Sequence, residues 1–139
     1  MMVITIIVIV PITVAFINCV GQTKFPVSKQ LEIQSNACTQ NLDIIHLQDC
    51  KIDQDSFSKC GFLTSNFNIF VNNKPNDSFY GTATLIRSDL DVTNVHTDED
   101  GRAIILDAAG CTWANFYLPS GSGPVARAQR ENYCNLIIP

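Results

Sequence analysis

Three groups of polar side chains stand at the ends of apolar runs in this chain. Asn18 ends the first run, Gln48 and Asp49 end the second, and Asn115 with Tyr117 ends the last. Amide and carboxylate oxygens are ligands that hard cations prefer, and a phenol can contact a phosphate or assist proton transfer. Together with a bound cation and a water molecule, such groups could hydrolyse a phosphodiester.

Each of these residues also has a structural interpretation that the sequence leaves open. Asn18 precedes Gly21 and is typical of a turn, and Asp49 could begin the polar loop that follows its strand. Tyr117 could be an amphipathic aromatic of the core. His46 lies inside an apolar run, so a hydrogen-bonded core histidine is favoured over a metal ligand. The residue types alone therefore do not show whether these strand ends form a catalytic site or have only a structural role.

The elements that would position these side chains follow from the apolar pattern. It predicts strands over 12–19, 42–49, 66–71, 82–86, 92–95, 103–106 and 111–118. Helices are predicted after Pro26 and over 124–138, with a loop over 50–58 and turns over 72–77, 98–101 and 107–110.

The order of these elements predicts the fold class. Strand, helix and strand at the start of the chain are typical of parallel strands joined by a crossover. The later strands form a meander. The sequence therefore predicts an α/β fold with a mixed sheet and a layer of helices. Ligand sites in such sheets gather where strands end and loops begin.

Length and composition narrow the class of protein further. A chain of 139 residues with 46% apolar side chains corresponds to one domain that can bury a core. The formal net charge is −4, whereas nucleic-acid-binding modules usually carry a basic surface that neutralises phosphates. The charge therefore counts against tight nucleic-acid binding by this chain alone.

Residues 1–11 are predicted to be an apolar extension that is separate from a domain over 12–139. No charged residue precedes Lys24, and residues 3–10 form an apolar run of Val, Ile and one Thr, as in a secretory signal or a membrane anchor. However, no basic residue stands before this run, and its Val and Ile content favours strands. A nuclear or cytoplasmic location is therefore favoured, with secretion or membrane anchoring as the alternative.

The six cysteines could be either reduced core residues or partners in disulfide bonds. No C-x-x-C pair occurs, and each cysteine lies in or beside an apolar segment, where a free thiol acts as a small hydrophobic side chain. Reduced core cysteines are therefore favoured. The alternative is a disulfide framework, which would make the chain a small secreted binding protein.

Six short segments of the chain resemble known motifs and occur in the same order. They are residues 16–21 ("x-x-N-x-x-G"), 43–49 ("D-I-I-x-L-Q-E"), 80–83 ("R-G-T-A"), 101–104 ("G-R-x-I"), 115–121 ("N-x-Y-x-P-S-G") and 127–133 ("R-x-x-R-E-x-F"). Over residues 12–139 the chain thereby resembles the endonuclease/exonuclease/phosphatase superfamily of DNase I-like proteins. Within it, the chain is most similar to the endonuclease domain of LINE-type retrotransposons. No single segment is specific, but six in order are.

The resemblance implies a fold, a partner and roles for the strand-end residues. The expected fold is a DNase I-like sandwich of mixed sheets, of which this chain supplies roughly the first half and mainly one sheet. An uncovered sheet face would favour self-association. By the resemblance, Asn18 and Asp49 hold Mg²⁺, Tyr117 and Asn115 contact the phosphate, and DNA is the partner. No small-molecule cofactor is expected.

The sequence also departs from the family pattern. Asp49 stands where the family has a Glu, and Tyr80 stands where it has an Arg. The shorter carboxylate should weaken Mg²⁺ binding, because Mg²⁺ demands a strict ligand geometry. The family's later "G-D-F-N" and "S-D-H" motifs are expected beyond Pro139. The resemblance therefore predicts a truncated, magnesium-dependent retrotransposon endonuclease domain with little or no activity of its own.

Overall fold

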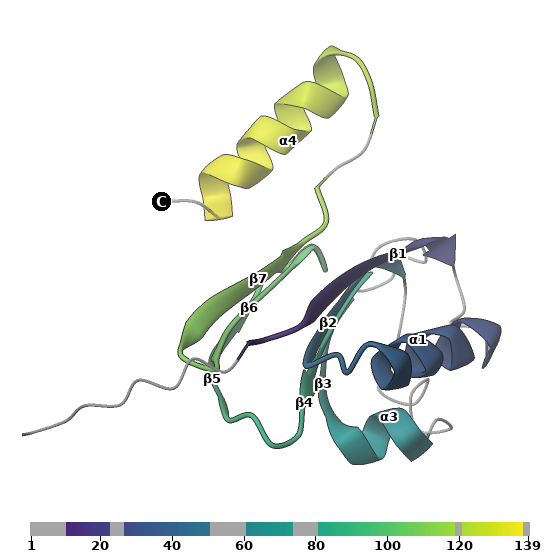
Figure 1. The fold of residues 1–139 in the computed structure, drawn as a ribbon. Coiled ribbons are helices and arrows are strands. Elements are labelled where there is room, and N and C mark those ends of the chain that lie inside the picture. The colour runs from purple at the N-terminus through teal and green to yellow at the C-terminus, as the bar shows by residue number, and fades with distance from the viewer. Residues whose placement is uncertain (1–10, 23–26, 51–60, 74–80, 119–120, 138–139) are drawn as a thin grey trace, which may run out of the picture.

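Two sheets packed face to face form the centre of the computed structural model, which describes residues 11–22, 27–50, 61–73, 81–118 and 121–137 (Figure 1). The elements follow in the order β1 (Val14–Gln22), α1 (Val27–Thr39), β2 (Ile44–Cys50), α3 (Gly61–Asn66), β3 (Phe67–Asn73), β4 (Gly81–Arg87), β5 (Val92–Thr97), β6 (Ala103–Ala108), β7 (Cys111–Phe116) and α4 (Pro124–Ile137). Helices α1 and α3 lie on the outer side of one sheet, and α4 lies beyond β7 (Figure 1).

The first sheet, sheet A, has the strand order β1-β2-β4-β3. β1 and β2 are parallel, with Val14 opposite Ile44, and α1 connects them. β4 runs antiparallel to both β2 and β3. The second sheet, sheet B, is an antiparallel meander in the order β5-β6-β7. The predicted mixed α/β fold, with a strand–helix–strand start and a later meander, is confirmed.

The core consists of two apolar clusters, one on each face of sheet A. The cluster between sheet A and its helices includes Ile33, Ile45, Leu47, Leu63 and Leu85. The cluster between the two sheets consists of Ile44, Ile86, Ile104, Leu106 and Ala108. Because side chains alternate between the faces of a strand, the neighbours Ile44 and Ile45 lie in different clusters. The central strands β2 and β4 are therefore buried on both faces.

The expectation that the chain supplies mainly one sheet is wrong. Three strands form sheet B, and its inward side chains close the apolar cluster against sheet A. Sequence periodicity identifies strands but does not assign them to sheets, because pairing depends on contacts between distant segments. Sheet B covers the face of sheet A whose exposure would have driven self-association, so that argument for self-association no longer holds within the described residues.

Element boundaries differ from the predictions at a few positions. β3 continues to Asn73, inside the turn predicted over 72–77, and the strand predicted over 111–118 ends at Phe116. β6 extends to Ala108, which leaves Ala109 and Gly110 as a two-residue hairpin turn with φ values of 52° and 75°. Positive φ at both central residues matches the right-handed twist of the flanking strands.

Helix α3 was not predicted, because its six residues are too few to show a helical period. The loop predicted over 50–58 lies outside the described residues, except that Cys50 ends β2. Residues 1–10 of the predicted apolar extension are also outside them. In the part of the chain that the structure describes, no helix is long and apolar enough to cross a membrane.

Four cysteines whose side chains the structure describes are free thiols. Cys19 is buried, Cys134 is half-buried, and Cys38 and Cys111 are exposed. This agrees with the prediction of reduced cysteines at these four positions. It opposes a framework that would pair all six cysteines.

Candidate functional site

The C-terminal part of β2 lies against β7, and β1 is paired alongside β2 (Figure 1). Asn18 of β1 is paired in register with Gln48 of β2. The Gln48 side chain then donates a hydrogen bond from Nε2 to Oδ1 of Asn115 in β7, with a length of 3.1 Å. Asp49 directly follows Gln48, and Tyr117 lies two residues beyond Asn115. The structure therefore joins the polar end of β2 to β7 through Gln48 and Asn115.

Asn115 is fully buried, and its amide joins the two sheets. Its Nδ2 atom lies 3.2 Å from the carbonyl oxygen of Leu47, 2.9 Å from that of Ala83 and 3.2 Å from Oγ1 of Thr84. With Gln48 bound to Oδ1, both ends of the amide contact sheet A. The amide therefore faces the protein interior and holds β7, the strand before Tyr117, against sheet A. The phosphate contact of Asn115 stays a prediction.

Asp49 and Asn18 flank an irregularity in the pairing of β1 with β2. The pairs Asn18–Gln48 and Gln22–Cys50 are separated by four residues of β1 but only two of β2. Asp49 adopts a φ of 55°, a region that few residues other than glycine occupy. Such bulges redirect side chains and are common beside active sites. Asp49 is half-buried and Asn18 is exposed.

Asn18 and Asp49 are the two residues that the sequence predicts as Mg²⁺ ligands. Their oxygens are the donor type that Mg²⁺ takes, and Mg²⁺ sites in proteins often use one or two carboxylates together with several waters. In the described ranges, no three His, Cys, Asp or Glu residues are grouped so that they could hold a metal ion. The Asn18 amide and the Asp49 carboxylate are of the donor types that a Mg²⁺ site completed by water would use.

Tyr117 follows the end of β7 and contacts Arg102, which precedes β6. The Tyr117 amide donates to the Arg102 carbonyl at 2.8 Å, and Nη1 of Arg102 donates to the Tyr117 carbonyl at 3.0 Å. The guanidinium Cζ lies 5.2 Å from the centroid of the phenol ring, within cation–π range. Both side chains are half-buried. Arg102 lies in the quoted "G-R-x-I" segment, but sequence reasoning gave it no role, because spacing does not show that it faces Tyr117.

Further polar bonds hold sheet B against this end of sheet A. Thr82, which is paired with Gln48, donates from Oγ1 to the carbonyl of Gly101 at 3.3 Å. Asn72 of β3 donates from Nδ2 to Oδ1 of Asp98 at 2.8 Å and to the carbonyl of Ala103 at 2.9 Å. The segment that contains Arg102 is therefore fixed beside the strand end that contains Asp49.

His46 is a core residue, as the sequence predicted. It is 1% exposed, and its Nδ1 lies 3.0 Å from Oγ1 of Thr84. Burial lowers the pKa of His46 to about 4, so the imidazole is neutral at pH 7. Its ring stacks on Phe16 with centroids 4.8 Å apart.

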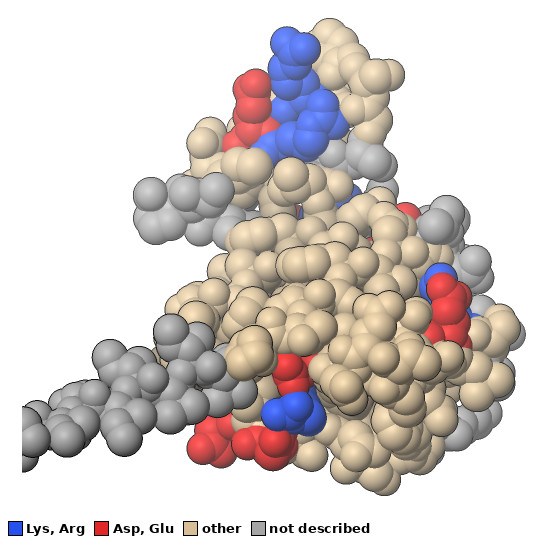
Figure 2. Space-filling model, viewed as in Figure 1, with Lys and Arg blue, Asp and Glu red and all other residues tan. Residues whose placement is uncertain are grey.

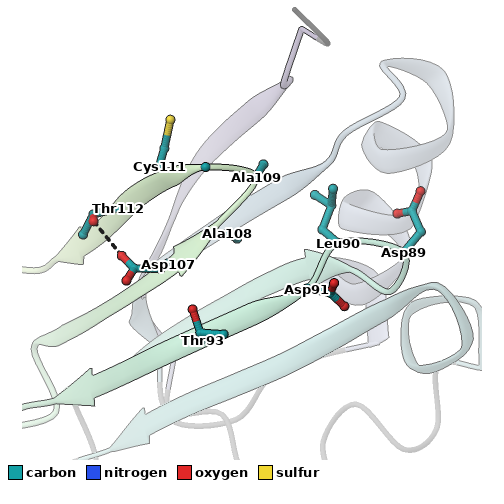
Figure 3. Close-up of a pocket in the computed structure, with 10 residues that line it drawn as sticks. Asp89, Leu90, Asp91, Thr93, Asp107, Ala108, Ala109, Cys111 and Thr112 are labelled. Atoms are coloured by element: carbon teal, nitrogen blue, oxygen red, sulfur yellow. Dashed lines mark hydrogen bonds between the residues drawn. The ribbon is translucent and has the colours of Figure 1, made fainter. Parts of the chain in front are cut away.

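A pocket of about 600 Å³ lies at the opposite end of sheet B, between the β4–β5 connection and the β6–β7 turn (Figure 3). Asp89, Asp91 and Asp107 line it. Asp107 accepts hydrogen bonds from Thr112 at 2.6 Å and from Asn94 at 2.8 Å. These bonds, that of Thr112 first, hold the pKa of Asp107 below its usual range. None of the residues predicted for catalysis or metal binding lines this pocket.

Charged side chains are sparse over the sheets on the face that Figure 2 shows, and basic side chains gather there on α4. That helix carries Arg127 and Arg130. Arg87, at the end of β4, pairs with two carboxylates, Asp43 beside the start of β2 and Asp89 beyond the end of β4. On the face shown, the basic side chains of the described residues therefore gather at α4, whereas the net charge of the chain is −4.

Comparisons with known proteins identify the fold. No family model matches the sequence, and no curated protein does. Among solved structures, the 3′ phosphatase NExo from Neisseria, bound to a product DNA hairpin, has a TM-score of 0.67 and 20% identity and covers 91% of this chain and 50% of its own. An AP endonuclease from Archaeoglobus fulgidus has a TM-score of 0.67 and 16% identity and covers 91% of this chain and 49% of its own.

The endonuclease domain of TRAS1, a telomere-specific non-LTR retrotransposon, has a TM-score of 0.61 and 13% identity. The match covers 93% of this chain and 56% of the TRAS1 domain. This chain thus spans about half the length of each of the three proteins. The chain therefore has a two-sheet, mixed α/β, DNase I-like fold that corresponds to roughly half of these nuclease and phosphatase structures.

Proposed function

We propose that this chain is part of a magnesium-dependent DNA endonuclease domain of the retrotransposon type. In this proposal Asn18 and Asp49 bind Mg²⁺, and Tyr117 contacts the phosphate. Asn115 acts through its neighbours, as a positioning residue. The reaction class is phosphodiester hydrolysis, which hard oxygen ligands and a phenol at a strand end would serve.

The hydrogen bond between Gln48 and Asn115 is the observation that carries this proposal. It joins the strand end of Asp49 to that of Tyr117 across the two sheets, at 3.1 Å. A metal ion and a phosphate oxygen must be held within a few ångströms of one another for phosphoryl chemistry. Strand ends joined by a buried amide are a rigid support for such groups.

The assignment to the retrotransposon type is more specific than the assignment to DNA phosphodiester hydrolysis. It is supported by the order of the six sequence segments and by the likeness to the TRAS1 endonuclease domain. NExo and the AP endonuclease match this chain with a higher TM-score, 0.67 against 0.61, so DNA phosphoesters as a class are the firmer substrate proposal.

We expect this polypeptide alone to have little or no nicking activity. Asp49 is the carboxylate among the proposed ligands, and one carboxylate binds Mg²⁺ weakly. The net charge of −4 also opposes the approach of a polyanion.

Metal binding can be tested by titrating the ¹⁵N-labelled chain with Mn²⁺, a paramagnetic substitute for Mg²⁺. Amide signals near Asn18, Asp49 and Tyr117 should broaden first, and excess Mg²⁺ should reverse the effect. Asp49→Ala should abolish this selective broadening, whereas Asp91→Ala, which removes an exposed carboxylate at the other end, should leave it unchanged. Broadening that is centred elsewhere would contradict the proposed site.

The activity expectation has a separate test. The purified chain is incubated with supercoiled plasmid and Mg²⁺, and nicking is followed on a gel. Nicking should stay near background. Strong nicking that disappears in Asp49→Ala would contradict the expected inactivity while supporting the proposed metal ligand.

A further inference from the structure

We infer that Arg102 is a positioning and phosphate-binding residue of the proposed site. This inference rests on the proposed function, because it assumes that Tyr117 contacts a phosphate. It adds a cation to a site for which Asn18, Asp49 and Tyr117 supply no positive charge.

Contacts on both backbone and side chain hold Arg102 against Tyr117. Two hydrogen bonds, of 2.8 and 3.0 Å, join the residues, and the guanidinium Cζ lies over the ring, 5.2 Å from its centroid. The phenol is rotatable about two bonds, so a planar group on its face limits the orientations that it can take. Arg102 therefore sets the direction of the Tyr117 hydroxyl.

The Arg102 backbone is itself fixed by Asp98. Oδ1 of Asp98 accepts from the amides of Arg102 and Ala103, at 2.9 and 2.8 Å. The same carboxylate accepts from Asn72 at 2.8 Å, and its Oδ2 accepts from the Tyr133 hydroxyl at 3.1 Å. Four donors thus share the negative charge of Asp98, which reduces its repulsion of an anion nearby.

Arg102 also lies at the end of the molecule that contains Asp49. The neighbouring Gly101 accepts from Thr82, which is opposite Gln48 and hence beside Asp49. The other described cations lie elsewhere. Arg87 is bound to carboxylates near the start of β2, Lys29 pairs with Glu32 on α1, and two arginines belong to α4.

Arginine suits this position for a chemical reason. Its guanidinium presents several N–H donors in a plane, so it can bind a phosphate oxygen while it stacks on an aromatic ring. A lysine would keep the charge but lose the planar stack. Replacing Arg102 by Lys should therefore change phosphate binding. The same replacement of an arginine that only solvates the surface would have no such effect.

The test uses the full chain and a thymidine dinucleotide, which carries a single phosphodiester. Ring and guanidinium NMR signals of Tyr117 and Arg102 are followed during the titration. We expect saturable shifts at both residues. Arg102→Met should weaken the dinucleotide affinity roughly three- to ten-fold, which corresponds to the loss of one hydrogen bond of ordinary net strength. Arg102→Lys should have an intermediate affinity, with altered Tyr117 ring shifts.

Arg127→Met is the matched control, because it removes the same charge from the exposed face of α4. If Arg102→Met and Arg102→Lys keep wild-type affinity while wild type shifts at Tyr117, the inference about Arg102 is overturned and the proposed function stands. If the wild-type chain shows no dinucleotide shifts at Tyr117, the proposed contact of Tyr117 with a phosphate is wrong. The inference about Arg102, which depends on that contact, is then wrong as well. Equal weakening by Arg127→Met would indicate a general charge effect and would also overturn the assignment to Arg102.

Discussion

Sheet A and sheet B are held in the fold by different forces. In sheet A, the first six residues of β4 are all buried, and apolar clusters cover both faces of the central strands. In sheet B, β5 is exposed along nearly all its length, and only the inward face of β6 and β7 is covered. Sheet A therefore stabilises the fold, whereas sheet B is attached to it through one face.

The attachment of sheet B differs between its two ends. Apolar side chains such as Ile104 and Leu106 pack against sheet A in the middle. At the end near Tyr117, the contacts are hydrogen bonds from Asn115, Asn72 and Thr82. Hydrogen bonds are directional, so they fix geometry more closely than apolar contacts do. Sheet B is therefore held by directional hydrogen bonds at the end that contains the candidate site, where the placement of side chains would decide activity.

The largest effect is expected from truncating the core of sheet A. Leu85→Ala removes a fully buried side chain from the cluster under α1 and α3, and should lower the free energy of unfolding by about 2–5 kcal/mol. Urea denaturation followed by circular dichroism measures this. A loss below about 1 kcal/mol would contradict the view that sheet A carries the stability.

The second effect is a dependence of stability on pH. The pKa of His46 falls from 6.5 to about 4 on folding because burial disfavours the charged form. The unfolded chain therefore binds a proton that the folded chain does not, and stability is lost as pH falls from 6.5 to 4. At about 1.4 kcal/mol per pKa unit, the loss amounts to about 3 kcal/mol.

Urea denaturation at a series of pH values would show this loss. The His46→Leu variant should lack the slope between pH 6.5 and 4, whereas the exposed His96 should be replaceable by Gln with the slope retained. An unchanged slope in His46→Leu would assign the effect to other groups.

The third effect concerns the polar bonds between the sheets. Asn115→Ala leaves the Leu47 and Ala83 carbonyls without this donor inside the protein, and should cost about 1–3 kcal/mol. The Tyr117 amide signal should shift in NMR spectra while the signals of Ile33 and Leu63 stay in place. Asn68→Ala, an exposed amide on β3, is the matched control and should change neither.

The smallest effect is expected on the outer face of sheet B. Val95 is 42% exposed, so Val95→Ala should alter the free energy of unfolding by less than about 0.5 kcal/mol. A loss as large as that of Leu85→Ala would show that another surface covers β5, and the contrast between the two sheets would fail.

Much of the fold could be predicted from local patterns. The apolar runs around Ile45 and Leu85 mark strands because both of their faces are buried, and such strands read as continuous apolar segments. The run before Asn115 also marks a strand. By contrast, the six residues of α3 and the bulge at Asp49 leave no periodic signal.

The sequence by itself determined the strands, the α/β class and the polar residues at the strand ends, because each depends on chemistry within a few neighbouring positions. Only the tertiary structure decided that these strands form two sheets, that the Asn115 amide is buried between them and that Arg102 stacks on Tyr117. Those contacts join residues far apart along the chain or on different strands. They depend on how the sheets pack, and a linear pattern of residue types does not contain that information.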